Sequence, residues 1–334
     1  MNILLSGYFD KNLGDDAMQK LVVSSFPEHK FYVNFNQREM LTHLEEFDNV
    51  YLNEPCPDTE LFLSVIGTGF MYKGKRAKAE KLISMLTQKK VKYKKSALLN
   101  CSLESFDSPL AQKFANSDLS SYGLITCRDS VSYGYLTKNI RSAKICMYPD
   151  MVFSASYGFA PKLPSQVLGV APVRRMYSGD NFEYYHKLAD LCDDFCENHN
   201  CTVRLFAFDN GLENDVSAAT SVKELMKNKE KAEIVIYSNN PEHIANMISE
   251  CAYFVGSRFH SIVIAMSANV NAVAVYDMEK LEILCREYNI PYLSKGEFTP
   301  HGAKKLLFGS PACSNVDFSA AKGHVDALRE YINS

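Results

Sequence analysis

Short apolar runs alternate with amphipathic segments along the chain, and this alternation restricts the possible folds more than any other feature. The apolar runs of the first half are residues 2–6, 31–35, 61–66, 96–100 and 124–126. The segments between them, in which apolar side chains recur three and four positions apart, are residues 15–26, 76–88, 109–118 and 130–138. Such spacing is typical of helices that bury one face. Strands that alternate with helices predict a parallel sheet.

The second half repeats the pattern. Its predicted strands are residues 167–173, 202–208, 233–237, 252–255 and 272–276, and its clearest helices are residues 182–198 and 241–250. A chain of 334 residues exceeds the usual size of one hydrophobic core. We therefore predict an α/β protein with two Rossmann-like, doubly wound domains that face a cleft.

The chain then divides into four parts. They are an N-terminal domain 1–153, a linker 154–166, a C-terminal domain 167–315 and a C-terminal helix 316–334. The linker shows no periodicity and contains Gly158, Pro161 and Pro164, which are typical of connecting segments. By analogy with two-domain folds of this type, the last helix is expected to pack on the first domain.

Composition excludes several classes of protein. Hydrophobic residues make up 46% of the chain and charged residues 22%, and the net charge is −3. This balance predicts a soluble protein without bulk attraction to nucleic acid. The N-terminal apolar run is too short for a signal peptide, and no apolar run reaches the length of a membrane span. We therefore expect a cytoplasmic location.

The ten cysteines do not suggest a disulfide scaffold or a metal site. Most lie inside apolar strands or helices, and no CxxC pair occurs, so reduced buried thiols are the better interpretation. Cys192 and Cys196 lie one helical turn apart, but no further ligand pair follows at a spacing typical of zinc. We predict no bound metal.

A basic segment lies at residues 73–95. It contains ten Lys or Arg residues against the single acidic residue Glu80. One interpretation is an ordinary solvated helix surface. The alternative is peripheral contact with an anionic membrane at its inner face, or with an acidic lipid-linked acceptor.

The segment from Gly256 to Ser261 places Arg258 and His260 where an apolar strand turns into an apolar helix. In a βαβ unit, ligands bind at the carboxyl ends of strands, where helix N-termini offer free N–H groups and a positive dipole end. Histidine is the side chain that changes charge near neutral pH. The sequence therefore predicts an anion site with a proton donor.

The loop after the first strand carries Asn12, Gly14, Asp15 and Asp16. One interpretation is a tight turn at Gly14 with Asp15 as a helix cap. The other is that Asn12 and Asp15 reach the ligand site, because first-strand loops line it in doubly wound domains. The loop matches neither GxxxxGK[ST] nor GxGxxG, which argues against a Walker loop and a standard dinucleotide site.

Other strand ends carry candidate residues. Gly67 and Gly69 either form a simple turn or let a ligand approach the backbone. Arg128 follows residues 124–127 as Arg258 follows its strand, so the two arginines could clamp one small dianion. Alternatively, Arg128 pairs with Asp129 or a neighbouring carboxylate. Arg174 adds positive charge to the site or is a solvated loop residue.

Together these motifs resemble the polysaccharide pyruvyl transferase family. They are Asn12-x-Gly14-Asp15-Asp16, Gly67-Thr68-Gly69, Arg128-Asp129-x-x-Ser132, Tyr148-Pro149-Asp150, Ser257-Arg258-Phe259-His260-Ser261 and Tyr276. The resemblance implies a GT-B-like fold with the acceptor on the first domain and the donor on the second. It also implies transfer of a pyruvyl group from phosphoenolpyruvate to two hydroxyls of a sugar, forming a ketal in cell-surface polysaccharide or exopolysaccharide biosynthesis.

The resemblance also implies roles for individual residues. His260 would be the general acid, and Arg128 and Arg258 would bind the donor and stabilise charge. Asp15 or Asp16 would accept a proton from the acceptor hydroxyl or hold the sugar. The residues expected to bind substrate are Arg258, Asn12, Gly14, Asp16, Gly67, Gly69, Ser257, Arg174 and Tyr276. The expected partners are phosphoenolpyruvate as co-substrate, with no other cofactor, and a lipid-linked or nucleotide-linked sugar.

Two other functions fit the same residues. A GT-B glycosyltransferase would use Arg258 and His260 to bind the pyrophosphate of a nucleotide sugar. A non-catalytic glycan-binding subunit would not depend on His260.

Overall fold

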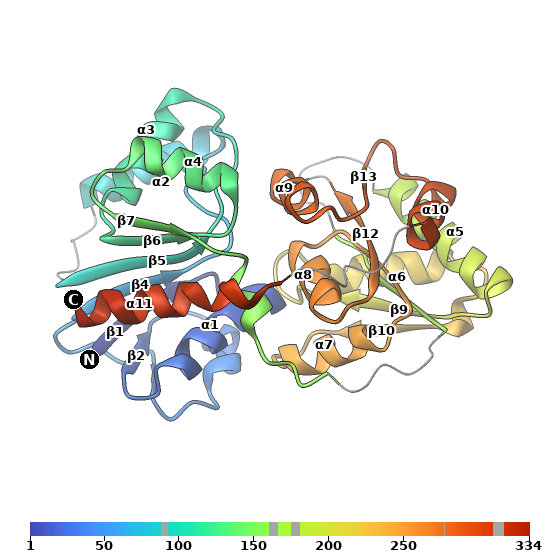
Figure 1. The fold of residues 1–334 in the computed structure, drawn as a ribbon, viewed down its shortest axis with the longest axis horizontal. Helices are drawn as coiled ribbons and strands as arrows, with labels where there is room; N and C mark the ends of the chain where they lie inside the picture. Colours follow the sequence, from blue (N-terminus) through green and yellow to red (C-terminus); the bar gives the residue numbers. More distant parts are fainter. Residues whose placement is uncertain (88–92, 160–165, 175–180, 277, 310–316) are drawn as a thin grey trace. The chain divides into compact units, whose positions relative to one another are not determined.

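The computed structural model describes residues 1–87, 93–159, 166–174, 181–276, 278–309 and 317–334. The chain forms two compact units (Figure 1). Unit 1 comprises Met1–Phe9, Met18–Ser154 and Phe318–Ser334, and unit 2 comprises Asp10–Ala17 and Ala155–Asp317. Both are parallel-sheet α/β units, which confirms the prediction of two Rossmann-like domains.

Unit 1 is built on a seven-stranded sheet in the order β3-β2-β1-β4-β5-β6-β7. The strands are β1 (Asn2–Gly7), β2 (Lys30–Val33), β3 (Val50–Leu52), β4 (Leu61–Val65), β5 (Lys95–Cys101), β6 (Leu124–Cys127) and β7 (Lys144–Met147). β1 pairs in parallel with both β2 and β4, so the strand order reverses beside β1. In doubly wound sheets such a reversal marks where ligands bind.

Local side chains cap two of the helices of unit 1. The helices of this unit are most of α1 (Leu13–Ser25), α2 (Gly74–Thr87), α3 (Pro109–Leu119), α4 (Ser130–Asn139) and α11 (Gly323–Asn333). The Ser108 side chain accepts a hydrogen bond from Ala111 N at the start of α3, where Pro109 is the first helical residue. The Asp129 side chain accepts from Ser132 N and caps α4 in the same way.

The C-terminal helix α11 packs on β5 and β6 of unit 1. Lys95 at the start of β5 donates to the carbonyl oxygens of Tyr331 and Ile332, at 2.8 and 2.9 Å. These are last-turn carbonyls without intrahelical partners, which a lysine stabilises. The analogy-based expectation for this helix therefore agrees with its contacts.

Unit 2 contains a six-stranded sheet in the order β10-β9-β8-β11-β12-β13. The strands are β8 (Val167–Ala171), β9 (Thr202–Ala207), β10 (Ala232–Ile236), β11 (Tyr253–Gly256), β12 (Asn271–Tyr276) and β13 (Tyr292–Ser294). The helices are α5 (Phe182–Asn198), α6 (Asp215–Leu225), α7 (Pro241–Ser249), α8 (Phe259–Ser267), α9 (Glu279–Tyr288) and α10 (Pro300–Gly309). β11, which precedes the predicted anion site, lies inside the sheet between β8 and β12.

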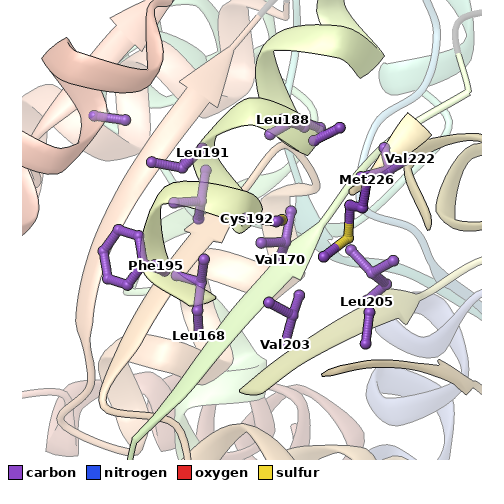
Figure 2. Close-up of a cluster of buried hydrophobic side chains, with 14 of the residues drawn as sticks. Leu168, Val170, Leu188, Leu191, Cys192, Phe195, Val203, Leu205, Val222 and Met226 are labelled. Carbon is purple, nitrogen blue, oxygen red and sulfur yellow. The ribbon is translucent and has the colours of Figure 1, made fainter. Parts of the chain in front are cut away.

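The core of unit 2 forms where α5 covers the sheet (Figure 2). Leu188, Leu191 and Phe195 of α5 are at most 1% exposed and pack against strand residues such as Val170 and Leu205. Each buried side chain of this size stabilises the fold by about 1.5–3 kcal/mol. The packed core gives the strand ends a fixed position, and the candidate site is built on those ends.

One segment lies in a different unit from the one that the sequence suggests. We expect residues 1–153 to form one domain, but Asp10–Ala17 belong to unit 2. Leu13 N donates to Phe208 O at 2.9 Å, and Asn12 forms a β-bridge with Asp209. Otherwise unit 1 ends at Ser154 and resumes at Phe318, near the predicted boundaries. Part of the predicted linker, 160–165, lies outside the described residues, as do residues 310–316.

Among the described residues, no helix has the length and apolar character needed to cross a membrane.

Candidate functional site

The β11–α8 turn carries the predicted anion site of unit 2. Arg258 occupies the N-cap position of α8 with extended backbone angles, and in the described structure its side chain makes no capping hydrogen bond. Ser261 Oγ donates instead to Arg258 O at 2.7 Å. A Cβ atom on Gly256 would lie 2.4 Å from Ser261 Oγ, so only glycine fits this turn. The turn thus ends a parallel strand at a helix N-terminus, as predicted.

The Arg258 guanidinium is buried and held by carboxylates that follow β9. Its Nε and Nη2 donate to Asp215 Oδ2 and Oδ1 at 2.8 and 2.6 Å. Its Nη1 forms an ion pair with Glu213. The Asp215 side chain is fully buried, whereas that of Glu213 is 35% exposed. The bidentate pair fixes the plane of the guanidinium.

Asp215 lies at the start of α6 and is tied to Asp209. Its Oδ2 accepts a hydrogen bond from Asp209 N at 3.1 Å. Burial raises the pKa of the Asp215 carboxyl, and the Asp209 charge raises it further. The Arg258 guanidinium in direct contact opposes this rise, because an opposite charge favours the ionised form.

The α1 loop packs against this turn within unit 2. Asn12 Nδ2 donates to Asp209 Oδ2 at 3.2 Å, and Asn12 Oδ1 accepts from Gly14 N at 3.1 Å. A Cβ atom on Gly14 would lie 1.7 Å from His260 Nδ1. The imidazole therefore occupies the space that a side chain on Gly14 would need, and the structure brings Asn12, Gly14, Arg258 and His260 together.

The two acidic residues of this loop differ. Asp16 is fully buried, and Tyr237 OH donates to its Oδ2 at 2.8 Å. Burial raises the pKa of Tyr237, and the neighbouring Asp16 raises it further. Asp15 is half-buried in the first turn of α1, where a carboxylate is stabilised by the helix dipole. The contact with Tyr237 gives Asp16 a structural role that the sequence does not reveal.

The other predicted residues of unit 2 lie at neighbouring strand ends. Ser257 is buried, and its Oγ lies 2.7 Å from Tyr184 OH. Arg174 is exposed after β8, and its backbone N approaches Asp215 Oδ1 at 3.5 Å. Tyr276 ends β12, and its side chain lies outside the described part of the structure.

Arg128, Gly67 and Gly69 belong to unit 1. Arg128 is 4% exposed, and its Nη1 donates to Asp150 Oδ2 at 2.8 Å. Its partner is thus a neighbouring carboxylate rather than Asp129, whose side chain caps α4. A Cβ on Gly67 would lie 3.4 Å from Arg128 Nη1, and one on Gly69 would lie 2.7 Å from Ile66 Cδ1. A side chain at position 67 would make ordinary contacts, and one at position 69 would require only the end of the Ile66 side chain to move.

Asp150 and Asn100 complete a buried network in unit 1. Asn100 Nδ2 donates to Asp150 Oδ2 at 2.9 Å, and Asn100 Oδ1 accepts from Met151 N at 2.9 Å. Asn100 has a φ of 62°, a conformation that Asn adopts more easily than most residues. Arg128 thus belongs to a buried network in which Asp150 accepts hydrogen bonds from both Arg128 and Asn100.

Sequence reasoning missed the acidic partners. Asp209, Glu213 and Asp215 lie in the segment that follows the predicted strand 202–208, so a cluster of acids at a strand end was the available signal. Within the described residues, no group of three or more His, Cys, Asp or Glu side chains could hold a metal ion.

The basic segment is partly neutralised by acidic neighbours. Its lysines form ion pairs that include Lys73–Glu104 at 3.1 Å, Lys78–Asp107 at 2.7 Å, Lys81–Asp118 at 2.5 Å and Lys94–Glu60 at 3.8 Å. Exposed pairs of this kind contribute little stability. Residues 88–92 lie outside the described part, and membrane contact stays a prediction.

The fold and the β11–α8 turn define an α/β protein of the GT-B-like class. Similar solved structures include UDP-GlcNAc 2-epimerase from Neisseria meningitidis bound to UDP-GlcNAc, at a TM-score of 0.66 and 10% identity over 100% of both chains. The Methanocaldococcus jannaschii enzyme in complex with UDP-GlcNAc and UDP gives 0.63 and 10%, again over 100% of both chains. At these identities the likeness shows the fold alone.

A comparison of the sequence with family models identifies the family. A model of the polysaccharide pyruvyl transferase family matches residues 12–277, and the chain belongs to this family. Its members are transferases of polysaccharide biosynthesis. No curated protein matches the chain.

Proposed function

We propose that this protein transfers the pyruvyl group of phosphoenolpyruvate to two hydroxyls of a sugar and forms a ketal. The observation that carries the proposal is the position of Arg258 and His260 at the N-terminus of α8, in a chain of the pyruvyl transferase family. A helix N-terminus attracts anions through its N–H groups and dipole. Phosphoenolpyruvate carries both a phosphate and a carboxylate.

The reaction balances with one proton donor and one acceptor. Protonation of the methylene carbon of phosphoenolpyruvate makes it a methyl group and leaves C2 electrophilic. Two sugar oxygens then bond to C2, the bond between C2 and the phosphate oxygen breaks, and inorganic phosphate leaves. Of the two hydroxyl protons, one replaces the proton given to carbon and the other leaves with phosphate or solvent.

We assign His260 to the protonation step and Arg258 to stabilising the anionic donor. Asp215 occupies the edge of the guanidinium formed by Nε and Nη2. The donor would therefore approach Nη1, where the partner is the more exposed Glu213. Asp15 is the candidate proton acceptor for the sugar hydroxyl, because Asp16 is buried against Tyr237.

The acceptor that we propose is a lipid-linked or nucleotide-linked sugar. Its support is the likeness of the fold to structures described with UDP-GlcNAc bound. The same likeness supports one alternative, a glycosyltransferase that uses a nucleotide sugar. Arg128 is buried against Asp150, so its proposed contact with the donor needs a separate test.

The test is an incubation of the protein with phosphoenolpyruvate and a panel of UDP-sugars, with release of inorganic phosphate as the measurement. We expect phosphate release together with a pyruvyl ketal on the acceptor, seen by mass spectrometry. His260→Gln should abolish both signals. Release of UDP without phosphate would support glycosyl transfer instead. Unchanged binding of glycans by His260→Ala, without turnover in the wild type, would support a non-catalytic subunit.

A further inference from the structure

A continuous set of hydrogen bonds joins the α1 loop to the β11–α8 turn, and all of it lies in unit 2. Asn12 Nδ2 donates to Asp209 Oδ2 at 3.2 Å, and Asp209 N donates to Asp215 Oδ2 at 3.1 Å. The same Asp215 oxygen accepts from Arg258 Nε at 2.8 Å. The position of the guanidinium is therefore linked, bond by bond, to Asn12.

At the Asn12 end, the same hydrogen bonds support the backbone on which the His260 imidazole packs. Asn12 Oδ1 accepts from Gly14 N at 3.1 Å and holds the first turn of α1. A Cβ atom added to Gly14 would lie 1.7, 2.3 and 2.4 Å from the Nδ1, Cγ and Cε1 atoms of the His260 ring. The imidazole thus packs directly on the backbone of this turn. Asn12 therefore bonds both to Asp209, on the path to Arg258, and to Gly14, against which His260 packs.

Asp209 and Asp215 are both 0% exposed. Asp209 Oδ1 accepts from Gly211 N and Asn214 N at 3.0 and 3.1 Å, while its Oδ2 accepts from Asn12. Buried carboxylates are costly unless such bonds satisfy them. A fully satisfied buried network permits few alternative geometries.

We propose that Asn12, Gly14, Asp209 and Asp215 are positioning residues that hold His260 and Arg258 in one geometry for pyruvyl transfer. This inference rests on the proposed function. It gives Asn12 and Gly14 a role other than the sugar contact expected from sequence. It also explains why the Asn12-x-Gly14 motif and the Arg258-x-His260 motif occur in one chain.

The first test exchanges donor and acceptor between Asn12 and Asp209. Asp209→Asn places an amide N–H donor against the Nδ2 donor of Asn12, so their hydrogen bond is lost. We expect kcat to fall about 10- to 100-fold with little change in the KM for phosphoenolpyruvate. Adding Asn12→Asp restores the bond in the reversed direction, because the new carboxylate still accepts from Gly14 N. The double variant should regain most of kcat. A double variant no better than Asp209→Asn, or a single variant with wild-type kcat, overturns the proposal.

The second test does not depend on the substrate. Gly14→Ala should displace the His260 ring, whereas the control Gly296→Ala adds a Cβ that meets nothing within 4 Å. The measurement is the ring nitrogen resonances of His260 in ¹⁵N-histidine-labelled protein, assigned with His260→Gln. We expect them to shift in Gly14→Ala alone, with both variants folded by circular dichroism and a thermal midpoint lowered only in Gly14→Ala.

The two proposals can fail separately. If the wild type forms no ketal from phosphoenolpyruvate, the proposed function fails, while the resonances still decide whether Gly14 positions His260. If the resonances of Gly14→Ala match those of the wild type, the positioning role is overturned whatever the enzyme's substrate.

Discussion

Arg128 in unit 1 and Arg258 in unit 2 follow parallel strands in the same way, but their surroundings differ. The helix after Arg128, α4, is capped by the Asp129 side chain. The helix after Arg258, α8, has Arg258 itself at the N-cap, with no capping bond from that side chain in the described structure. A carboxylate therefore lies at the N-terminus of α4, whereas the N-cap side chain of α8 is a cation, which favours an anionic ligand there.

The partners of the two arginines differ as well. Arg128 is bound to Asp150, which belongs to a network with Asn100. Arg258 is bound by a fully buried carboxylate on one side and a 35% exposed one on the other. The comparison indicates that one local sequence pattern supports a structural ion pair in unit 1, and it agrees with the reactive site that we propose in unit 2. Substitutions at the paired positions test this difference.

The largest effect is expected on removing the partner of Arg128. Asp150→Ala leaves a buried guanidinium without its carboxylate, which costs about 3–5 kcal/mol of unfolding free energy. Urea denaturation would measure it. Asp150→Asn keeps the shape and the hydrogen-bond acceptor, so it should lose less. A loss below about 1 kcal/mol in Asp150→Ala would show that the pair is not structural.

The next effect concerns activity. Arg258→Lys removes the bidentate fork, and we expect kcat/KM for phosphoenolpyruvate to fall about 100-fold. Arg128→Lys is the matched variant in unit 1, and it should lower the denaturation midpoint while kcat of the folded protein stays within about threefold. Equal losses of kcat in the two variants would break the comparison and support the two-arginine clamp.

A third prediction concerns pH, because unit 1 contains the buried histidine His324. Its Nε2 donates to Pro149 O at 2.9 Å, and its Nδ1 lies 2.6 Å from Thr126 Oγ1. A carbonyl oxygen can only accept, so the neutral ring carries its proton on Nε2. Burial, with a smaller contribution from the Arg128 charge, lowers the pKa of His324 from 6.5 to about 4, although the hydrogen bond to Pro149 O and the Asp150 charge oppose this shift.

The folded state therefore resists protonation that the unfolded state accepts. Stability is complete above pH 6.5 and is lost as the pH falls towards 4, by about 2 kcal/mol at pH 5 for His324. Burial also lowers the pKa of His43 in unit 1, to about 3. His324→Gln should remove roughly half of the acid loss, measured by denaturation at pH 7 and pH 5. An unchanged slope would contradict the buried neutral ring.

The fold was accessible from sequence because its signals are local. Periodicity predicts many of the longer strands and helices, but it does not find the helices α6, α9 and α10 or the strands β3 and β13, which have three residues each. Edge strands of this length are too short to show alternation. The grouping of residues 10–17 with unit 2 depends on the bond from Leu13 N to Phe208 O, and no local pattern encodes it.

The candidate site shows the same limit. Arg258 and His260 are found from a strand–turn–helix pattern, whereas the Arg258–Asp215 pair joins residues 43 positions apart. Arg128 and Asp150 are 22 positions apart. The sequence predicts which residues carry charge at strand ends. The fold decides which carboxylate each arginine meets, and so whether the arginine is structural.

The smallest effect is expected at the α4 cap. Asp129→Ala removes the acceptor for Ser132 N at 2.7 Å and for the Ser102 hydroxyl at 2.8 Å, and the loss of the cap alone costs about 1–2 kcal/mol. Asp129→Asn retains an acceptor and serves as the matched control. If the α4 terminus is purely structural, both variants keep wild-type kcat, because only the unfolding free energy depends on the cap. A loss of kcat in Asp129→Ala at full folding would mean that the α4 terminus also meets substrate, and the contrast between the two helix termini would no longer hold.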